Sequence, residues 1–329
     1  MRLRRNTTLR LIRTALAAAC LVAFAGAACA EAPRKDNAPV PMLWKVSDDD
    51  NSLYLLGSFH LLKPDDYPLS KDVDMAFADA EALVFEIPPE ELGSPALGMQ
   101  MGQAALRTDG TALDSELPPD TVAQLQAWTA ANAAELQKLQ MTPQMLQLFE
   151  PWFAGLMVSI VEMGKYGLDP KLGLDVNLAQ KAAQAGKPVS GLETGAQQIA
   201  FLDGMDKVEQ LQFLQEALKA SNEGPAEIEK LHAAWRSGDV AAMWDEMAVE
   251  MRAQFPKLYR RINVERNDAW VPKLVERLEA PGTDDTLVVV GALHLLGEDG
   301  VVEKLRAKGY EVERICSACA SPAQQDRAQ

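Results

Sequence analysis

The sequence predicts an α+β fold of the α/β-like kind, in which a large helical middle covers a mixed central sheet. Short apolar runs bounded by turn-forming residues indicate strands near both ends of the chain, at 43–46, 53–56, 83–87, 187–192, 286–290 and 310–315. Between about 94 and 186, and again between about 195 and 280, the apolar spacing is helical. The segments 53–62 and 287–296 resemble each other, which predicts a β-loop-α-β unit used twice.

Composition is that of a globular protein and excludes nucleic acid as a partner. The chain has 329 residues, of which 48% are hydrophobic and 24% charged, enough for a large core. Its 32 basic and 47 acidic side chains give a formal charge of −15, whereas phosphate binding needs a basic face. With only three histidines in the chain, each one is informative.

The first 30 residues are predicted to be a signal peptide. Five arginines precede an apolar run at 15–28, and Ala28-Cys29-Ala30 has the small-x-small pattern of a cleavage site. We expect cleavage after Ala30 and export to the periplasm, with no transmembrane segment in the mature chain, because no apolar run is long enough to span a bilayer. A lipoprotein anchored at Cys29 is the less favoured alternative. Cleavage leaves 27 basic against 47 acidic side chains, a formal charge of −20.

The remaining chain is predicted to hold one domain between a linker and a tail. The segment 31–41 contains three prolines and suits an extended linker, 42–315 forms the domain, and 316–329 is the tail. Cys316 and Cys319 are expected to form a local disulfide. A thioredoxin-like site would need a helix after the pair, and only ten residues follow Cys319.

Capping residues and prolines predict the helix boundaries. Thr142 with the proline that follows it predicts a helix start, and Pro151 predicts a kink in that helix. Asp175 is expected to begin a helix that Gly186 ends, and Pro256 to break or bend the long helical stretch from Val240 to Leu278. The apolar run at the fifth strand does not alternate, which indicates a sheet covered on both faces.

Two histidines, His60 and His294, follow strand ends in the two matching segments, each within a Gly-x-x-His motif. The motif glycines, Gly57 and Gly291, let the chain leave the strand sharply or let a ligand approach the backbone. Neighbouring parallel strands end at one edge of a sheet, so the two histidines are expected to face one pocket. One such histidine alone would indicate core packing, but two favour a metal or acid/base site.

Two glutamates complete the candidate set. Glu86 lies in an otherwise apolar strand, where a buried carboxylate needs a partner or a metal, although an edge strand facing water would also suit it. Glu193 ends another strand, where a helix N-terminus alone would also explain it. Together with the histidines they form a ligand set that divalent ions accept. From spacing alone, His232 is interpreted as structural, and Arg266-Asn267 as a solvated polar pair on a helix.

Seven short motifs in sequence order resemble the TraB/PrgY/GumN family over about 42–315. They are Leu43-Trp44-Lys45-Val46, Gly57-Ser58-Phe59-His60, Glu86 at its strand end, Gly173-Leu174-Asp175, Gly186-Lys187-Pro188-Val189 with Gly191-Leu192-Glu193-Thr194, Glu265-Arg266-Asn267 and Gly291-Ala292-Leu293-His294. The family is similar to the Tiki proteins, membrane-anchored metal-dependent proteases with two Gly-x-x-His motifs. It is more remotely similar to erythromycin esterase and ChaN-like haem-binding proteins.

The resemblance implies a divalent metal site, with the ion (Mn²⁺, Co²⁺ or Zn²⁺) undefined. Its metal ligands would be His60, His294, Glu86 and Glu193, and its catalytic residues Glu86, Glu193, Arg266 and Asn267. The pocket would be lined by Gly57, Ser58, Asp175 and Gly291. This chain departs from the Tiki proteins because no membrane anchor follows its signal peptide, so the substrate of those proteins does not transfer.

Two functions follow from these patterns. The first is an exported metal-dependent hydrolase, peptidase-like, acting on a peptide or small-molecule substrate, in which a glutamate is a further ligand or the base for the ion's water. Arg266 and Asn267 would then position a carbonyl or stabilise developing negative charge. The alternative is a non-catalytic periplasmic protein that binds a peptide or haem in the same cleft.

Overall fold

A computed structural model describes residues 38–319. Its six-stranded sheet contains every strand predicted from the apolar runs: β1 (Leu43–Ser47), β2 (Ser52–Ser58), β3 (Ala82–Phe85), β4 (Val189–Gly191), β5 (Thr286–Gly291) and β6 (Glu311–Ile315). Strands β2 and β5 are buried along their whole length, which confirms that the centre of the sheet is covered on both faces.

The strand order is β4-β3-β5-β2-β1-β6. Neighbours among β4, β3, β5 and β2 are parallel, whereas β1 is antiparallel to both β2 and β6. Four adjacent parallel strands therefore end at one edge, and the register of β2 and β5 places Ser58 beside Gly291. The duplication ends there, because β3 pairs with β5 while β6 lies beside β1 at the far edge of the sheet.

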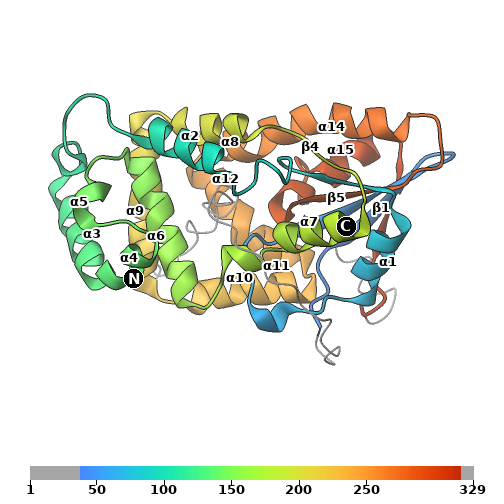
Figure 1. Ribbon diagram of the computed structural model, residues 1–329, viewed down its shortest axis with the longest axis horizontal. Coiled ribbons are helices and arrows are strands. Elements are labelled where there is room, and N and C mark those ends of the chain that lie inside the picture. The colour runs from blue at the N-terminus through green and yellow to red at the C-terminus, as the bar shows by residue number, and fades with distance from the viewer. Residues whose placement is uncertain (1–37, 320–329) are drawn as a thin grey trace, which may run out of the picture.

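Helices cover the sheet and extend beyond it, as predicted for the middle of the chain. In Figure 1, α14 and α15 lie above the strands, α1 and α7 lie below them, and α3 to α6 with α9 form the opposite end of the molecule. The helices are α1 (Lys71–Asp79), α2 (Pro95–Ala105), α3 (Pro119–Ala131), α4 (Ala133–Lys138), α5 (Pro143–Leu146), α6 (Pro151–Lys165), α7 (Leu174–Ala185), α8 (Gly195–Asp203), α9 (Lys207–Glu223), α10 (Ala226–Ser237), α11 (Val240–Trp244), α12 (Glu250–Gln254), α13 (Pro256–Tyr259), α14 (Glu265–Leu278) and α15 (Val301–Ala307). None of the helices in residues 38–319 is both long enough and apolar enough to cross a membrane.

Most predicted helix boundaries are confirmed, and one is wrong. Thr142 caps α5, and Gly186 ends α7 in the left-handed conformation, with φ +67°. Pro256 does break the long stretch after α11, since the chain leaves helical geometry at Phe255. Pro151 does not kink a helix. It begins α6, because a proline at the first helical position removes an N–H that would have no partner inside the helix.

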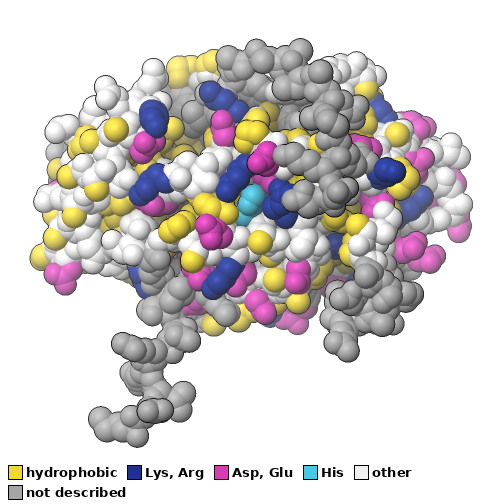
Figure 2. Space-filling view, turned by 90° about the horizontal axis from the view of Figure 1, so that it is seen from below, with side chains coloured by type: hydrophobic (Ala, Val, Ile, Leu, Met, Phe, Trp, Pro, Cys, Tyr) yellow, Lys and Arg dark blue, Asp and Glu magenta, His cyan; other side chains and the backbone are white. Residues whose placement is uncertain are grey.

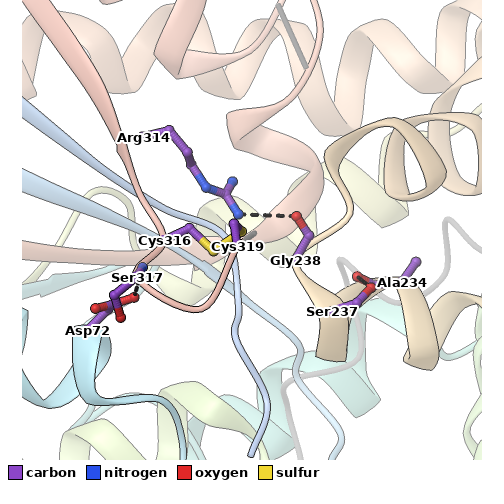
Figure 3. Close-up of a disulfide and its surroundings, with 8 residues drawn as sticks. All are labelled: Asp72, Ala234, Ser237, Gly238, Arg314, Cys316, Ser317 and Cys319. Carbon is purple, nitrogen blue, oxygen red and sulfur yellow. Dashed lines mark hydrogen bonds between the residues drawn. A yellow bond between two sulfur atoms is a disulfide. The ribbon is translucent and has the colours of Figure 1, made fainter. Parts of the chain in front are cut away.

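Both borders of the domain are fixed by specific contacts. At the start, the amide of Val40 donates to the carbonyl of Arg236 at 2.7 Å, so the end of the predicted linker is extended but bound to the fold. At the end, Cys316 and Cys319 form the predicted disulfide, and the amide of Ser317 donates to Asp72 at 2.7 Å (Figure 3). The predicted signal peptide, the alternative lipid site at Cys29 and the last ten residues lie outside the described residues.

Candidate functional site

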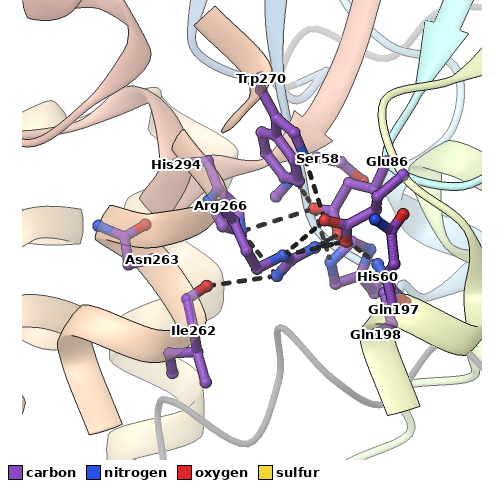
Figure 4. A network of polar contacts seen from close by, with 12 residues as sticks. Ser58, His60, Glu86, Gln197, Gln198, Ile262, Asn263, Arg266, Trp270 and His294 are labelled. Carbon is purple, nitrogen blue, oxygen red and sulfur yellow. Dashed lines mark hydrogen bonds and ion pairs between the residues drawn. The ribbon is translucent and has the colours of Figure 1, made fainter. Parts of the chain in front are cut away.

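Four neighbouring parallel strands each supply one side chain to a buried polar cluster just beyond their carboxyl ends. His60 follows β2, Glu86 follows β3, Glu193 follows β4, and His294 lies in the 3₁₀ turn η7 (Ala292–Leu295) after β5. This edge is where ligands bind in sheets of parallel strands. All four side chains are buried, and Figure 4 shows His60, Glu86 and His294 gathered beside Arg266. The predicted meeting of the two histidine motifs is therefore seen in the fold.

A carboxylate fixes the proton position of His60. Nδ1 of His60 lies 2.9 Å from Oδ1 of Asp175, in the first turn of α7, and the hydroxyl of Ser58 donates to the same oxygen. Because a carboxylate accepts hydrogen bonds, the neutral imidazole carries its proton on Nδ1. The lone pair of Nε2 is then on the side of Glu86, whose Oε1 lies 3.8 Å away.

His294 has the same tautomer for a different reason. Its Nε2 lies 3.1 Å from Nη1 of Arg266, and a guanidinium only donates, so Nε2 accepts. Its Nδ1 lies 2.7 Å from Oδ1 of Asn267, which accepts because the amide nitrogen of Asn267 donates to the carbonyl of Asp299. The Nε2 atom is also 3.9 Å from Oε1 of Glu86, so both imidazoles direct Nε2 at one carboxylate oxygen.

Arg266 occupies the centre of the cluster. The residue lies in the first turn of α14, directly after a π-helical turn, η6 (Arg260–Val264). Its Nη2 donates to Oε2 of Glu86 at 2.6 Å and to Oε1 of Glu193 at 2.5 Å, and its Nε donates to Glu193 at 3.0 Å. The predicted solvated pair is thus corrected: Arg266 is 3% exposed and Asn267 is fully buried.

The electrostatics follow from burial and from this guanidinium. Burial opposes ionisation of Glu86, but Arg266, followed by the two histidines and the amide of Gly291, outweighs it and lowers the pKa of Glu86 to about 2. Burial raises the pKa of Glu193, which Arg266 offsets only in part. Burial and the charge of Arg266 lower the pKa of His294 to about 3, so this imidazole is neutral near pH 7.

The cluster also carries an excess of negative charge. The cluster contains three carboxylates, of which Glu86 and Glu193 bind the guanidinium of Arg266 and Asp175 binds His60. Counted with neutral imidazoles and ionised carboxylates, three formal negative charges accompany one positive charge, which gives a formal charge of −2. A buried site with this excess attracts a cation.

Glycines give the cluster its close packing. A Cβ atom on Gly291 would lie 3.1 Å from Oε1 of Glu86 and 3.2 Å from Nε2 of His60, so the glycine leaves a cradle between the two groups. A Cβ on Gly173, the residue before α7, would overlap the carbonyl of His60 at 2.2 Å. Gly57 instead lets β2 pack on Ala292, and it does not face the cluster.

Two neighbours of the cluster were not predicted from the sequence. Nε1 of Trp270 donates to Glu193 at 3.0 Å, and the Arg266 guanidinium lies 4.8 Å from the centre of its ring. The spacing of four residues between Arg266 and Trp270 on one helix is the signal that could have indicated this contact. Gln198 donates to Oε2 of Glu86 at 2.9 Å, and no sequence pattern points to it.

The third histidine belongs to a separate buried group. His232 lies on α10, and its Nε2 is 2.8 Å from Oδ2 of Asp66. The same oxygen accepts from the amide of Lys63, and Oδ1 of Asp66 accepts from Arg236. Its ring is stacked nearly parallel to that of Trp235, at an interplanar angle of 10°. This supports the structural interpretation of His232, although its carboxylate partner comes from 166 residues away in the chain.

The face in Figure 2 shows Lys and Arg side chains spread among acidic ones, without a continuous basic area among the residues drawn in colour.

A family model described as the TraB/PrgY/gumN family matches residues 42–314. The protein named Uncharacterized protein YbaP, from Escherichia coli strain K12, is 26% identical over 255 residues, which cover 77% of this chain and 87% of YbaP. The YbaP of Shigella flexneri matches with the same figures. No solved structure matches the chain.

Proposed function

The chain belongs to the TraB/PrgY/gumN family, and we propose that it is a metal-dependent hydrolase of peptide-like substrates. One observation carries this proposal: the Nε2 atoms of His60 and His294 lie 3.8 and 3.9 Å from the same oxygen of Glu86. Donors that each lie ~2.1 Å from one ion are at most ~4.2 Å apart, so these separations suit a shared divalent ion.

The chemistry of the donors also fits an ion. Neutral imidazole nitrogens and an ionised carboxylate are ligands of Mn²⁺, Co²⁺ and Zn²⁺, and the cradle at Gly291 adjoins two of them. Asp175 and Asn267 hold the outer nitrogens of the imidazoles, the usual support for metal-binding histidines. Within residues 38–319, no three His, Cys, Asp or Glu side chains form a ready-made site, since Arg266 lies between Glu86 and His294.

The contacts divide the predicted roles among the residues. His60, His294 and Glu86 would hold the ion, which when bound supplies a Lewis acid and a water molecule of lowered pKa. Glu193 anchors Arg266 and, with its raised pKa, is the carboxylate left to accept a proton. Arg266 would stabilise developing negative charge on the substrate. Asn267, which was predicted to be catalytic, would instead orient the ligand His294 by accepting a hydrogen bond from its Nδ1.

The test is metal content followed by cleavage. The purified protein is incubated with Mn²⁺, Co²⁺ and Zn²⁺ in turn, dialysed, and analysed by mass spectrometry for bound ion. We expect about one ion per chain, lost in His60→Ala and His294→Ala and retained in the matched control His232→Ala. The loaded protein is then screened against a peptide library, with Glu86→Gln as the inactive control.

Each failure has a defined meaning. If the wild-type protein takes up no ion, or if the double histidine variant keeps it, the proposed site is wrong. If the loaded protein leaves every peptide intact and instead binds a peptide or haem stoichiometrically, the non-catalytic alternative replaces the hydrolase.

A further inference from the structure

We propose that Arg266 is a displaceable internal cation, which takes the place of the divalent ion when no metal is bound. The inference rests on the proposed function, because it concerns how that same site exchanges one cation for another. It predicts that metal binding competes with a side chain of the protein itself.

The first argument is the position of the guanidinium. Arg266 binds two of the three proposed ligands, through Nη2 to Glu86 at 2.6 Å and through Nη1 to Nε2 of His294 at 3.1 Å. An ion on Nε2 of His294 needs the one lone pair that Nη1 binds, so guanidinium and ion cannot share that atom. At Glu86 the guanidinium binds Oε2, whereas the oxygen that faces both imidazoles is Oε1. Both are cations, and either one compensates the buried charge of Glu86.

The second argument is that other groups can keep the guanidinium after it leaves these ligands. Glu193 accepts from Nε at 3.0 Å, and the carbonyl of Ile262 accepts from Nη1 at 3.3 Å. The rings of Trp270 and Phe201 lie 4.8 and 5.6 Å from the guanidinium carbon. Arg266 can therefore release Glu86 and His294 while Glu193 continues to hold it beside the loaded site.

The third argument is the charge balance. With Arg266 in place the cluster has a net charge of −2, counted with neutral imidazoles, so a divalent ion can enter without expelling the arginine from the protein. The ion must replace the hydrogen bond from Nη1 to Nε2 of His294, which has a substantial energy because its donor is charged. The arginine thus weakens metal binding and still leaves it favourable.

The experiment is calorimetric titration of metal-free protein with Mn²⁺. We compare wild type, Arg266→Ala and Arg266→Lys with Arg277→Ala, an arginine on the same helix that donates to Ser190 at 2.8 Å. Arg266→Ala should bind Mn²⁺ at least ~10-fold more tightly than wild type, since the competing hydrogen bond to His294 is gone. Arg266→Lys should fall between them, because lysine offers a point charge in place of the planar fork. Arg277→Ala should match wild type.

A second measurement identifies the competitor. Guanidinium chloride at concentrations far below denaturation should weaken Mn²⁺ binding by Arg266→Ala, because the free cation refills the vacated space. It should leave wild type unaffected, and urea should have no effect on either protein. If Arg266→Ala does not fold without metal, the affinity of Arg266→Lys relative to wild type decides.

The outcomes separate this inference from the proposed function. Wild type that binds Mn²⁺ with the same affinity as both Arg266 variants would overturn the inference and leave the metal site standing. Weaker binding in the variants would also overturn it, since Arg266 would then support the ion. No binding by any of these proteins would remove the proposed function itself.

Discussion

The molecule contains two buried groups in which histidine, arginine and carboxylate meet, and they are built in opposite ways. Around Asp66, one carboxylate is shared by His232, Arg236 and the amide of Lys63. Around Arg266, one guanidinium is shared by the carboxylates of Glu86 and Glu193. The first group has its acceptors saturated by donors, whereas the second has more acceptors than its single cation can serve.

The difference shows which histidines have chemistry available to them. His232 directs its Nε2 at the carboxylate that holds it, so its inward nitrogen is used in the fold. His60 and His294 are held through Nδ1, and both direct Nε2 at Glu86, while Nε2 of His294 also accepts from Nη1 of Arg266. Metal-binding histidines are commonly supported through one ring nitrogen while the other faces the ion, as Nδ1 and Nε2 are arranged in His60 and His294. In His232 it is Nε2 that binds the supporting carboxylate, and the contact joins two elements of the fold.

The largest expected effect is on the free energy of unfolding when the arginine of each buried group is replaced. In metal-free protein, Arg266→Met should lower the free energy of unfolding by ~3–5 kcal/mol, because two buried carboxylates lose their counter-charge. Arg236→Met should cost roughly 1.5–3 kcal/mol, because Asp66 keeps its histidine and its amide donor. Urea unfolding followed by circular dichroism measures both, and equal losses would mean that the groups do not differ as described.

A smaller effect is expected from the support of His294. Asn267→Leu removes the acceptor for Nδ1 and should weaken metal binding by about 10–100-fold. Asn267→Asp keeps an acceptor and should restore most of the affinity. Asp66→Asn is the matched control from the other group and should leave the metal affinity as it is. Calorimetric titration with Mn²⁺ measures the affinity of all three variants. A lower Mn²⁺ affinity in Asp66→Asn would mean that the two buried groups are energetically coupled.

The smallest effect concerns acid stability. Burial works against ionisation of Asp66, but His232 and the amide of Lys63 prevail, so the pKa of Asp66 is lowered from 3.8. A lowered carboxyl pKa gives stability that is complete above pH 3.8 and is lost as the pH falls through the folded value. Asp66→Asn should therefore flatten the decline in unfolding free energy below about pH 4. An unchanged acid slope in this variant would mean that Asp66 is not linked to acid unfolding.

The sequence predicted the parts of the site that depend on local pattern. All six strands, the shared edge at which β2 and β5 end, and the meeting of His60 with His294 follow from apolar runs, turn residues and a repeated motif. The burial of Arg266 and Asn267 was missed by residue spacing, because a polar pair on a helix has no local signal for distant partners. The carboxylates that bind Arg266 lie 73 and 180 residues away, and the groups that bind Asn267 lie 27 and 32 residues away. Only the family resemblance pointed to these two residues.

The prediction of a helix kink at Pro151 was wrong for a related reason. Proline is compatible with both a helix interior that bends and a first helical turn, and the choice depends on where the preceding helix ends. Here α5 ends at Leu146, four residues after its cap, so Pro151 starts a new helix. The partner of His232 could not be predicted from the sequence either, because Asp66 lies on a different element of the fold, 166 residues away in the chain.

The position of β5 in the sheet determines at which stage of synthesis the site can assemble. This strand lies between β2 and β3, although it is made more than 200 residues after both of them. Until it is inserted, the ends that carry His60 and Glu86 have no shared neighbour, and His294 is not yet in place. The polypeptide therefore has no assembled centre while it is being synthesised, and whatever activity that centre has begins only when the last tenth or so of the domain arrives.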